Sequence, residues 1–352
     1  AVSYFTSGVS VDEMEYVLRE EVLDAAGDVA VAKISIQYGL WIQAIVDFLI
    51  IAFTVFVMVR VIKSTERKLR EKDKFHRVRG IVPYTRLIPY IMETRNTSQN
   101  FIFDKIGMEK IDKYIKRKQE EGLANLTLMH VIVGAYCRAV SQRPAINRFI
   151  RGQKIYSRKK IEISLVVKKE MSLDSPDTVI KVILPPSATI EDVYNAFNEK
   201  IEGYRSHPNS SFDKLAKVLN FIPGLLLRWT VRFLRFLDYF GLLPRALTKL
   251  SPFHGSLFIT SMGSLGIPPI VHHLYDFGTV PVFIAFGAKQ REFKVRADGS
   301  VYKHSYVDIT YNLDERICDG YYYASAMKVI RGVFKNPECL DNPPEQVIED
   351  IR

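Results

Sequence analysis

Residues 310–320 read Thr-Tyr-Asn-Leu-Asp-Glu-Arg-Ile-Cys-Asp-Gly, and this stretch decides the fold of the larger part of the chain. The run before it, Val301–Tyr311, is predicted to pair with Phe293–Arg296 as a hairpin. The Asp-Gly pair at 298–299 is typical of the tight turn that such a hairpin needs. A helix is predicted directly after the stretch. Four charged residues lie between strand and helix: Asp314, Glu315, Arg316 and Asp319.

Upstream of this stretch, short strands alternate with long helices. Thr127 is a predicted helix cap, and the helix after it ends before Pro144. Thr189 is predicted to open a second helix. Further strands are predicted at 161–167, 178–184, 256–261 and 282–288, from period-two alternation or from continuous apolar runs. Mixed strands and helices over roughly 250 residues indicate one α/β domain.

The turn at 314–320 resembles the Asp-His-Arg-x-x-Asp-Gly motif of the chloramphenicol acetyltransferase and dihydrolipoyl acyltransferase superfamily. Asp314, Arg316, Asp319 and Gly320 match it, and Glu315 occupies the histidine position. Residues 125–128, 143–147, 258–263 and 286–288 also look like family segments, so the resemblance covers about residues 86–340. It implies a chloramphenicol-acetyltransferase-like mixed-sheet sandwich with flanking helices.

The resemblance also implies a chemistry. In this superfamily a histidine removes the proton from the thiol of coenzyme A or dihydrolipoamide, and the sulfur attacks an acyl carbonyl. A Ser or Thr hydroxyl stabilises the oxyanion. Carried over to this sequence, Glu315 would be the base, Thr260 the hydroxyl, and Asp319 the residue that orients the base region. A coenzyme A thioester would be the cofactor, with no metal.

Replacement of the histidine by Glu315 leaves two interpretations open. Proton transfer from a thiol is uphill by roughly 3 kcal/mol to an imidazole and roughly 6 kcal/mol to an unperturbed glutamate. Burial of Glu315 would raise its pKa and reduce the difference between these two free-energy costs. Glu315 is therefore either a tuned base in an active enzyme, or a structural carboxylate paired with Arg316 or another base in a fold without catalysis.

The other residues with reactive side chains give weaker indications of function. Cys318 is interpreted as a small buried residue rather than a nucleophile. His272 and His273, near Asp276, lack a third ligand at suitable spacing, so a metal site is not predicted. They remain a weaker candidate for a relocated base. The basic residues of 151–169 either meet the phosphates of coenzyme A or form a solvated face.

Charge is unevenly spread along the 352 residues. The net charge is +10, yet residues 1–35 are acidic and the basic excess begins at Arg60. No basic motif interleaved with aromatic residues indicates nucleic-acid binding, so an anionic membrane surface is the preferred partner. Three widely spaced cysteines predict neither disulfides nor a metal site, which fits a reducing compartment.

Residues 40–62 are apolar almost throughout and are long enough to cross a bilayer as one helix. Trp41 lies at one end. Basic residues follow the other end: Arg60, Lys63, Arg67, Lys68 and Arg70. Such a flank favours the cytoplasmic side. We therefore expect a single-pass protein of the cell membrane, with residues 1–35 outside and the α/β domain in the cytoplasm. A buried core helix is the alternative.

Residues 1–72 resemble the second half of a large-conductance mechanosensitive channel subunit. The similarity is carried by Ile36-Gln37-Tyr38-Gly39, by Ile42-Gln43 and by the run at 47–53, with Gly27-Asp28 in a segment like the extracellular loop. The first, pore-lining helix of that family has no counterpart in these residues. Because the chain begins at Ala1 rather than Met, we expect its true N-terminus to lie upstream.

The predicted domains are an extracytoplasmic loop at 1–35, a transmembrane helix at 36–62, a charged linker at 63–85 and the acyltransferase-like domain at 86–352. An insertion at 206–252 has no counterpart in the acyltransferase core. Within it, Arg228, Arg232 and Arg235 share one face of a predicted helix rich in Leu, Trp and Phe. That pattern is typical of a helix lying on anionic lipid. Packing on its own domain or on a partner is the alternative.

Two function classes therefore remain: a membrane-tethered enzyme for coenzyme A-dependent acyl transfer, and a channel-derived protein whose soluble domain is a non-catalytic binding or scaffold module. The resemblances also imply different homo-oligomers, a trimer for the acyltransferase and a pentamer for the channel. A short connector does not allow one chain to form a closed trimer through one part and a closed pentamer through the other.

Overall fold

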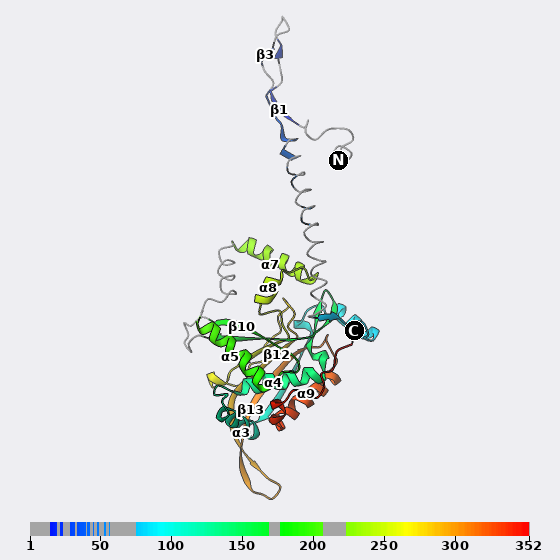
Figure 1. The fold of residues 1–352 in the computed structure, drawn as a ribbon. Coiled ribbons are helices and arrows are strands. Elements are labelled where there is room, and N and C mark those ends of the chain that lie inside the picture. Colours follow the sequence, from blue (N-terminus) through cyan, green and yellow to red (C-terminus); the bar gives the residue numbers. More distant parts are fainter. Residues whose placement is uncertain are drawn as a thin grey trace. The chain divides into compact units, whose positions relative to one another are not determined.

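The computed structural model describes residues 15–19, 22–23, 29–31, 34–39, 41–42, 45, 48, 53, 56, 75–168, 177–206 and 223–351. The chain divides into two compact units, Ala1–Lys72 and Asp73–Arg352 (Figure 1).

The first unit contains two short antiparallel strand pairs. β1 (Tyr16–Arg19) pairs with β4 (Ile34–Ile36), and β2 (Val22–Leu23) pairs with β3 (Val29–Val31). Most of the predicted transmembrane helix, 36–62, lies outside the described residues. Of its described positions, Ile36 ends β4 and Gln37 is not helical, whereas 38–39, 41–42, 45, 48, 53 and 56 are helical. Within the described part of the chain, no helix is both long enough and apolar enough to span a bilayer.

The second unit is built on a six-stranded mixed sheet. Its strand order is β10 (Asp177–Leu184), β9 (Ile161–Lys168), β11 (Leu257–Ser261), β12 (Val282–Val295), β13 (Val301–Asp314) and β6 (Gln99–Gly107). β11 runs parallel to both of its neighbours, and the other pairs are antiparallel. The predicted hairpin is confirmed, and Gly299 adopts the positive φ that its turn requires.

Helices cover one face of this sheet (Figure 1). They are α3 (Glu109–Glu120), α4 (Leu128–Gln142), α5 (Ile190–Ser206) and α9 (Gly320–Lys335). The predicted cap at Thr127 is confirmed, since its backbone N–H donates to Nδ1 of His130 at 3.1 Å. Alternate strand residues such as Ile284 and Ile309 enter the core beneath the helices. The mixed α/β class predicted from the sequence is therefore confirmed.

The opposite face of the sheet carries a smaller apolar cluster. Phe258 and Phe283 stack there with ring centroids 5.0 Å apart, and Leu274 packs against them. The segment between β11 and β12 is fixed over this face by two side chains of β13. Thr310 Oγ1 donates to the carbonyl of Ile270 at 2.7 Å, and Asn312 Nδ2 donates to the carbonyl of His272 at 2.6 Å.

A smaller antiparallel sheet begins the second unit. β5 (Phe75–Arg77), β8 (Lys154–Arg158) and β7 (Arg148–Arg151) lie in that order. α2 (Pro83–Ile91) follows β5. Part of the segment 63–85 predicted as a linker is therefore structured, because β5 completes this sheet and Pro83 opens a helix. Short 3-10 helices occur at Asn96–Ser98, Pro144–Asn147, Gly263–Leu265 and Pro337–Asp341.

The described part of the insertion forms α7 (Gly224–Tyr239) and α8 (Arg245–Leu250). In Figure 1 both lie at the end of the second unit away from the tip of the β12–β13 hairpin. Nζ of Lys181, in β10, donates to the carbonyls of Thr248, Ser251 and His254. The segment after α7 is thereby fastened to the edge of the large sheet.

Candidate functional site

The turn after β13 is held by a buried ion pair between two residues of the motif. Both oxygens of the Asp314 carboxylate accept hydrogen bonds from the Arg316 guanidinium, each at 2.8 Å. The guanidinium also donates to the carbonyls of Met92 and Glu93 at 3.2 and 3.0 Å. Asp314 is 0% exposed and Arg316 is 3% exposed. The pair therefore fixes the turn to the segment that follows α2.

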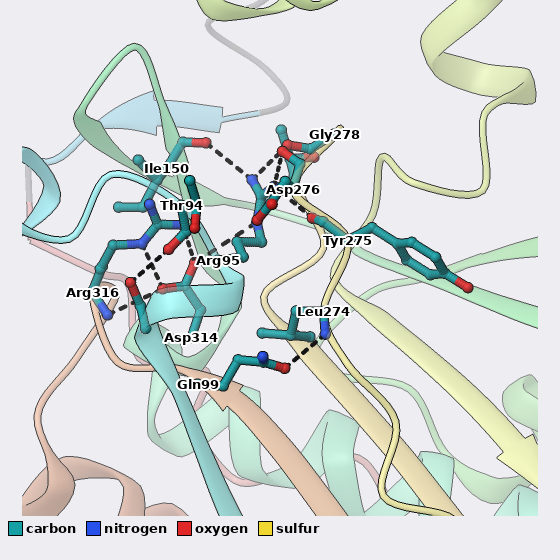
Figure 2. A network of polar contacts seen from close by, with 12 residues as sticks. Thr94, Arg95, Gln99, Ile150, Leu274, Tyr275, Asp276, Gly278, Asp314 and Arg316 are labelled. Carbon is teal, nitrogen blue, oxygen red and sulfur yellow. Dashed lines mark hydrogen bonds and ion pairs between the residues drawn. The ribbon is translucent and has the colours of Figure 1, made fainter.

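Arg95 extends this network to two other segments (Figure 2). Its Nε lies 3.7 Å from Asp314 Oδ2, and Nη1 donates to the carbonyls of Tyr275 and Asp276. Its Nη2 donates to the carbonyls of Ile150 and Gly278. Burial lowers the pKa of Arg95 to about 10. Two guanidiniums thus surround one carboxylate. We call Arg95, Asp314 and Arg316 the arginine clasp.

Asp319 has a structural task at the start of α9. It is the N-cap residue, and its Oδ1 accepts a hydrogen bond from the backbone N–H of Tyr322 at 2.8 Å. Such a cap satisfies one of the unpaired N–H groups of the first helical turn. The capping bond occupies one carboxylate oxygen, and the side chain lies at the surface.

Glu315 lies between the two clasp residues and points the other way. Its backbone N–H donates to the carbonyl of Ser98 at 2.9 Å, whereas its side chain is exposed. Arg316 pairs with Asp314, so the predicted pairing of Glu315 with Arg316 is wrong. β13 ends at Asp314, and in the turn that follows Glu315 is exposed whereas residues 314 and 316 are buried. No described residue gives the Glu315 carboxylate a hydrogen bond or an ion pair.

Thr260 is half-buried near the end of β11, on the face of the sheet opposite the helices. The register places Leu257 level with Val282, and Val282 level with Leu313. Measured along the strands from that level, Thr260 is displaced by three residues in one direction and Glu315 by two residues in the opposite direction. The two residues are therefore five positions apart along the strands. Five residues of extended chain span roughly 17 Å. One chain therefore does not bring Thr260 and Glu315 together.

The remaining candidates are mostly engaged in packing. Burial raises the pKa of the Cys318 thiol far above its usual range, so the thiol is a poor nucleophile. The Arg158 guanidinium is buried over the Phe149 ring and donates to Thr279 Oγ1. His272 stacks on Phe283, and its Nδ1 lies 2.7 Å from the carbonyl oxygen of His273. Among the described residues, no cluster of three His, Cys, Asp or Glu side chains is arranged to hold a metal ion.

The first 86 residues match the family model of the large-conductance mechanosensitive channel. Similar channels include one from Porphyromonas gingivalis, 39% identical over 70 residues, which are 20% of this chain and 50% of the channel. One from Haemophilus influenzae is 42% identical over 67 residues, 19% of this chain and 47% of the channel. The chain thus spans about half the length of the curated relatives it matches. The predicted resemblance of the N-terminal region is confirmed.

Solved structures with a similar fold include two acetyltransferases. A probable dihydrolipoamide acetyltransferase from Listeria monocytogenes has a TM-score of 0.45 and 14% identity, with 74% of this chain and 94% of that chain covered. A chloramphenicol acetyltransferase has a TM-score of 0.43 and 10% identity, with 72% and 96% covered. A dihydrolipoamide acetyltransferase and a chloramphenicol acetyltransferase are thus among the proteins of similar fold.

Proposed function

We propose that this chain is a membrane-tethered protein whose α/β domain is a binding or scaffold module without a working base at position 315. The observation that carries the proposal is the contrast within the motif. Asp314 and Arg316, which hold the turn, are buried and hydrogen-bonded to each other through both carboxylate oxygens. Glu315, in the position of the base, is exposed, and its carboxylate has no polar partner among the described residues.

The exposure of Glu315 matters because burial is what would make a carboxylate a stronger base. A thiol must lose its proton to become the attacking group. A carboxylate in water accepts that proton at a free-energy cost of roughly 6 kcal/mol. The turn keeps its shape without any contribution from the Glu315 side chain. Selection for the fold alone is sufficient to explain such a site.

Tethering is supported by the apolar run at 40–62 and by the family match of residues 1–86. We propose that residues 36–62 span the cell membrane once. The acidic segment at 1–35 would lie outside and the α/β domain in the cytoplasm, in accord with the basic residues after position 60.

Carbonate extraction of membranes tests the tether, and a single-cysteine variant tests the orientation. Ser300 is exposed at the hairpin tip and is suited to labelling. In a Cys339→Ser background, Ser300→Cys should resist an impermeant maleimide in intact cells and react after permeabilisation. Reaction in intact cells would show the opposite orientation. Release of the protein by carbonate would show that the chain is not anchored in the membrane.

Coenzyme A-dependent acyl transfer is the second candidate function. It is favoured by the retained scaffold of the motif and by a hydroxyl, Thr260, on the face of the sheet opposite helices α3, α4, α5 and α9. Since Thr260 and Glu315 lie far apart in one chain, the catalytic set of Thr260, Glu315 and Asp319 would have to be assembled from two copies. A trimer, as the acyltransferase resemblance implies, is one way to achieve this.

Calorimetry and turnover of the full chain in nanodiscs separate the two candidates. The scaffold proposal predicts no acetyl transfer from acetyl coenzyme A to small thiols. Glu315→His should create activity only if coenzyme A binds, because the stronger base lowers the proton-transfer cost by roughly 3 kcal/mol. Brisk turnover that Glu315→Gln abolishes would overturn the scaffold proposal in favour of the enzyme. Absence of coenzyme A binding in every variant would overturn the hypothesis of coenzyme A-dependent acyl transfer.

A further inference from the structure

Helix α7 presents a row of apolar side chains to solvent. Their spacing of three or four residues places them on one helical face. Their exposed fractions are 77% for Leu225, 65% for Trp229, 57% for Phe233, 56% for Phe236 and 55% for Phe240. A continuous row of large apolar side chains is unusual on a protein surface and marks a site that another apolar phase covers.

Three arginines border this row. Arg228, Arg232 and Arg235 each precede an apolar residue of the row by one position, so they lie along one side of it. The guanidinium carbon of Arg232 lies 5.4 Å from the centroid of the Trp229 ring. None of the three forms an ion pair with a described carboxylate. Long arginine side chains beside aromatic residues allow the charge to reach headgroups while the rings enter the interface.

The helix is attached to its domain by other residues. Asp238 is the buried residue of α7, and its Oδ1 lies 3.2 Å from Nε2 of His254 and 3.8 Å from Nε of Arg151. The backbone of Gly152 closely approaches the carbonyl of Tyr239, which a Cβ at position 152 would meet at 2.7 Å. These contacts hold the carboxyl-terminal end of α7. The apolar row is therefore not the surface by which α7 packs on its own domain.

A second exposed helix ends at the same place. α2 exposes Tyr84 and Ile91, at 71% and 69%. Glu93 and Thr94, which follow α2, line a cavity of about 260 Å³ together with residues 235, 238 and 239 of α7. The carboxyl-terminal ends of the two helices thus converge on one cavity. Apolar surface is concentrated on both elements that flank it.

We propose that α7 lies in the interface of a bilayer that contains anionic lipid, with its arginines on the headgroups and its aromatic row among the upper acyl chains. Charge selects lipid over a second copy of the chain as the occupant. Two α7 helices packed through their apolar rows would bring unpaired guanidiniums together, which is unfavourable. The inference rests on the proposed function only in that a tether would keep the bilayer close to α7.

The fluorescence of Trp229 tests this assignment. The chain has two tryptophans, so Trp41→Phe leaves Trp229 as the reporter. The full chain is placed in nanodiscs of phosphatidylcholine, with or without phosphatidylglycerol, made with acyl-brominated lipid. We expect a blue-shifted, lipid-quenched emission that requires phosphatidylglycerol. Replacing Arg228, Arg232 and Arg235 by Gln should weaken docking by roughly fivefold per charge.

A matched control removes the same charge elsewhere. Gln at Arg291, Arg296 and Lys303, all exposed on the β12–β13 hairpin, should leave the quenching unchanged. Iodide access to Trp229 that is equal in both nanodiscs, without quenching by lipid, would overturn the assignment. So would shielding of Trp229 that depends on protein copies per disc and not on lipid charge, which would indicate self-association. If residues 36–62 do not anchor the chain, the same readout with added vesicles still tests α7, so the two failures are distinguishable.

Discussion

The arginine clasp and helix α7 both depend on arginine, and they use it in opposite ways. In the clasp, Arg95 and Arg316 are almost fully buried around Asp314, and backbone carbonyls accept most of the remaining N–H groups. On α7, Arg228 and Arg232 are not paired with a described carboxylate, and Arg232 lies beside the exposed ring of Trp229. The buried, partnered arginines hold the fold together, whereas the exposed arginines are available to an outside partner, which we propose to be anionic lipid. The net charge of +10 does not distinguish the two.

Asp314→Asn is expected to have the largest effect, because it removes the negative charge from the arginine clasp. The substitution leaves two buried guanidiniums without their counter-charge, and breaking a buried ion pair in this way costs about 3–5 kcal/mol. We expect the urea midpoint of the full chain in phosphatidylcholine nanodiscs, followed by far-ultraviolet circular dichroism, to fall accordingly.

Asp104→Asn is the matched control. It removes the ion pair of Asp104 with Arg331, whose side chain is 51% exposed. Such a surface pair contributes less than about 1 kcal/mol. Equal losses for the two variants would mean that the clasp is no more important to the fold than a surface contact.

His130 supplies a test of buried polar groups that depends on pH. It is 3% exposed beneath the rings of Tyr194 and Phe197, and burial lowers its pKa from 6.5 to about 4. Because the folded state disfavours the charged form, its contribution is complete above pH 6.5. It declines as the pH falls toward 4, by roughly 3 kcal/mol in total.

His130→Gln isolates this effect, since glutamine at the same position preserves the reciprocal cap with Thr127. The difference in unfolding free energy between wild type and His130→Gln should shrink from pH 7 to pH 4. A difference that is constant over this range would show that His130 does not titrate with unfolding.

Local patterns in the sequence were sufficient for most of the second unit. Thr127 and Pro144 bound α4 as predicted, and the alternation at 161–167 became β9. β6 was missed, although it is the edge strand that pairs with β13. Its sequence, with polar residues at both ends, carries no clear alternation. Pairing with β13 supplies what its own pattern lacks, and that pairing is a contact distant in sequence.

The site shows the same limit at the level of single residues. The motif located Asp314, Arg316 and Asp319, but it did not indicate which carboxylate pairs with Arg316. Arg95 was missed because nearly all its partners are backbone carbonyls of distant segments, and carbonyls leave no signal in the sequence. The residues 36–62 and 207–222 lie largely or wholly outside the described part of the chain, so their predictions stay predictions.

Asp319 offers a smaller, sharper test of whether the motif serves the fold or catalysis. Asp319→Ala removes the cap of α9 and should cost about 1 kcal/mol of unfolding free energy. Asp319→Asn should restore most of that loss, because asparagine caps helices as well as aspartate does. Failure of asparagine to restore stability would show that the charge at 319 has a role beyond the cap.

The smallest expected effect on stability concerns the apolar row of helix α7. Trp229→Ser combined with Phe233→Ser should change the unfolding free energy by less than about 0.5 kcal/mol in phosphatidylcholine nanodiscs, since both rings are already exposed and surface substitutions rarely exceed that value. The same pair of substitutions should remove protection of α7 amides from hydrogen exchange in discs with phosphatidylglycerol. Leu243, 8% exposed in the segment between α7 and α8, provides the control, because Leu243→Ser should destabilise the domain in either lipid. A large loss from the surface pair in neutral lipid would mean that the apolar row is packed within the protein. Helix α7 would then serve the fold in the manner of the clasp rather than a bilayer.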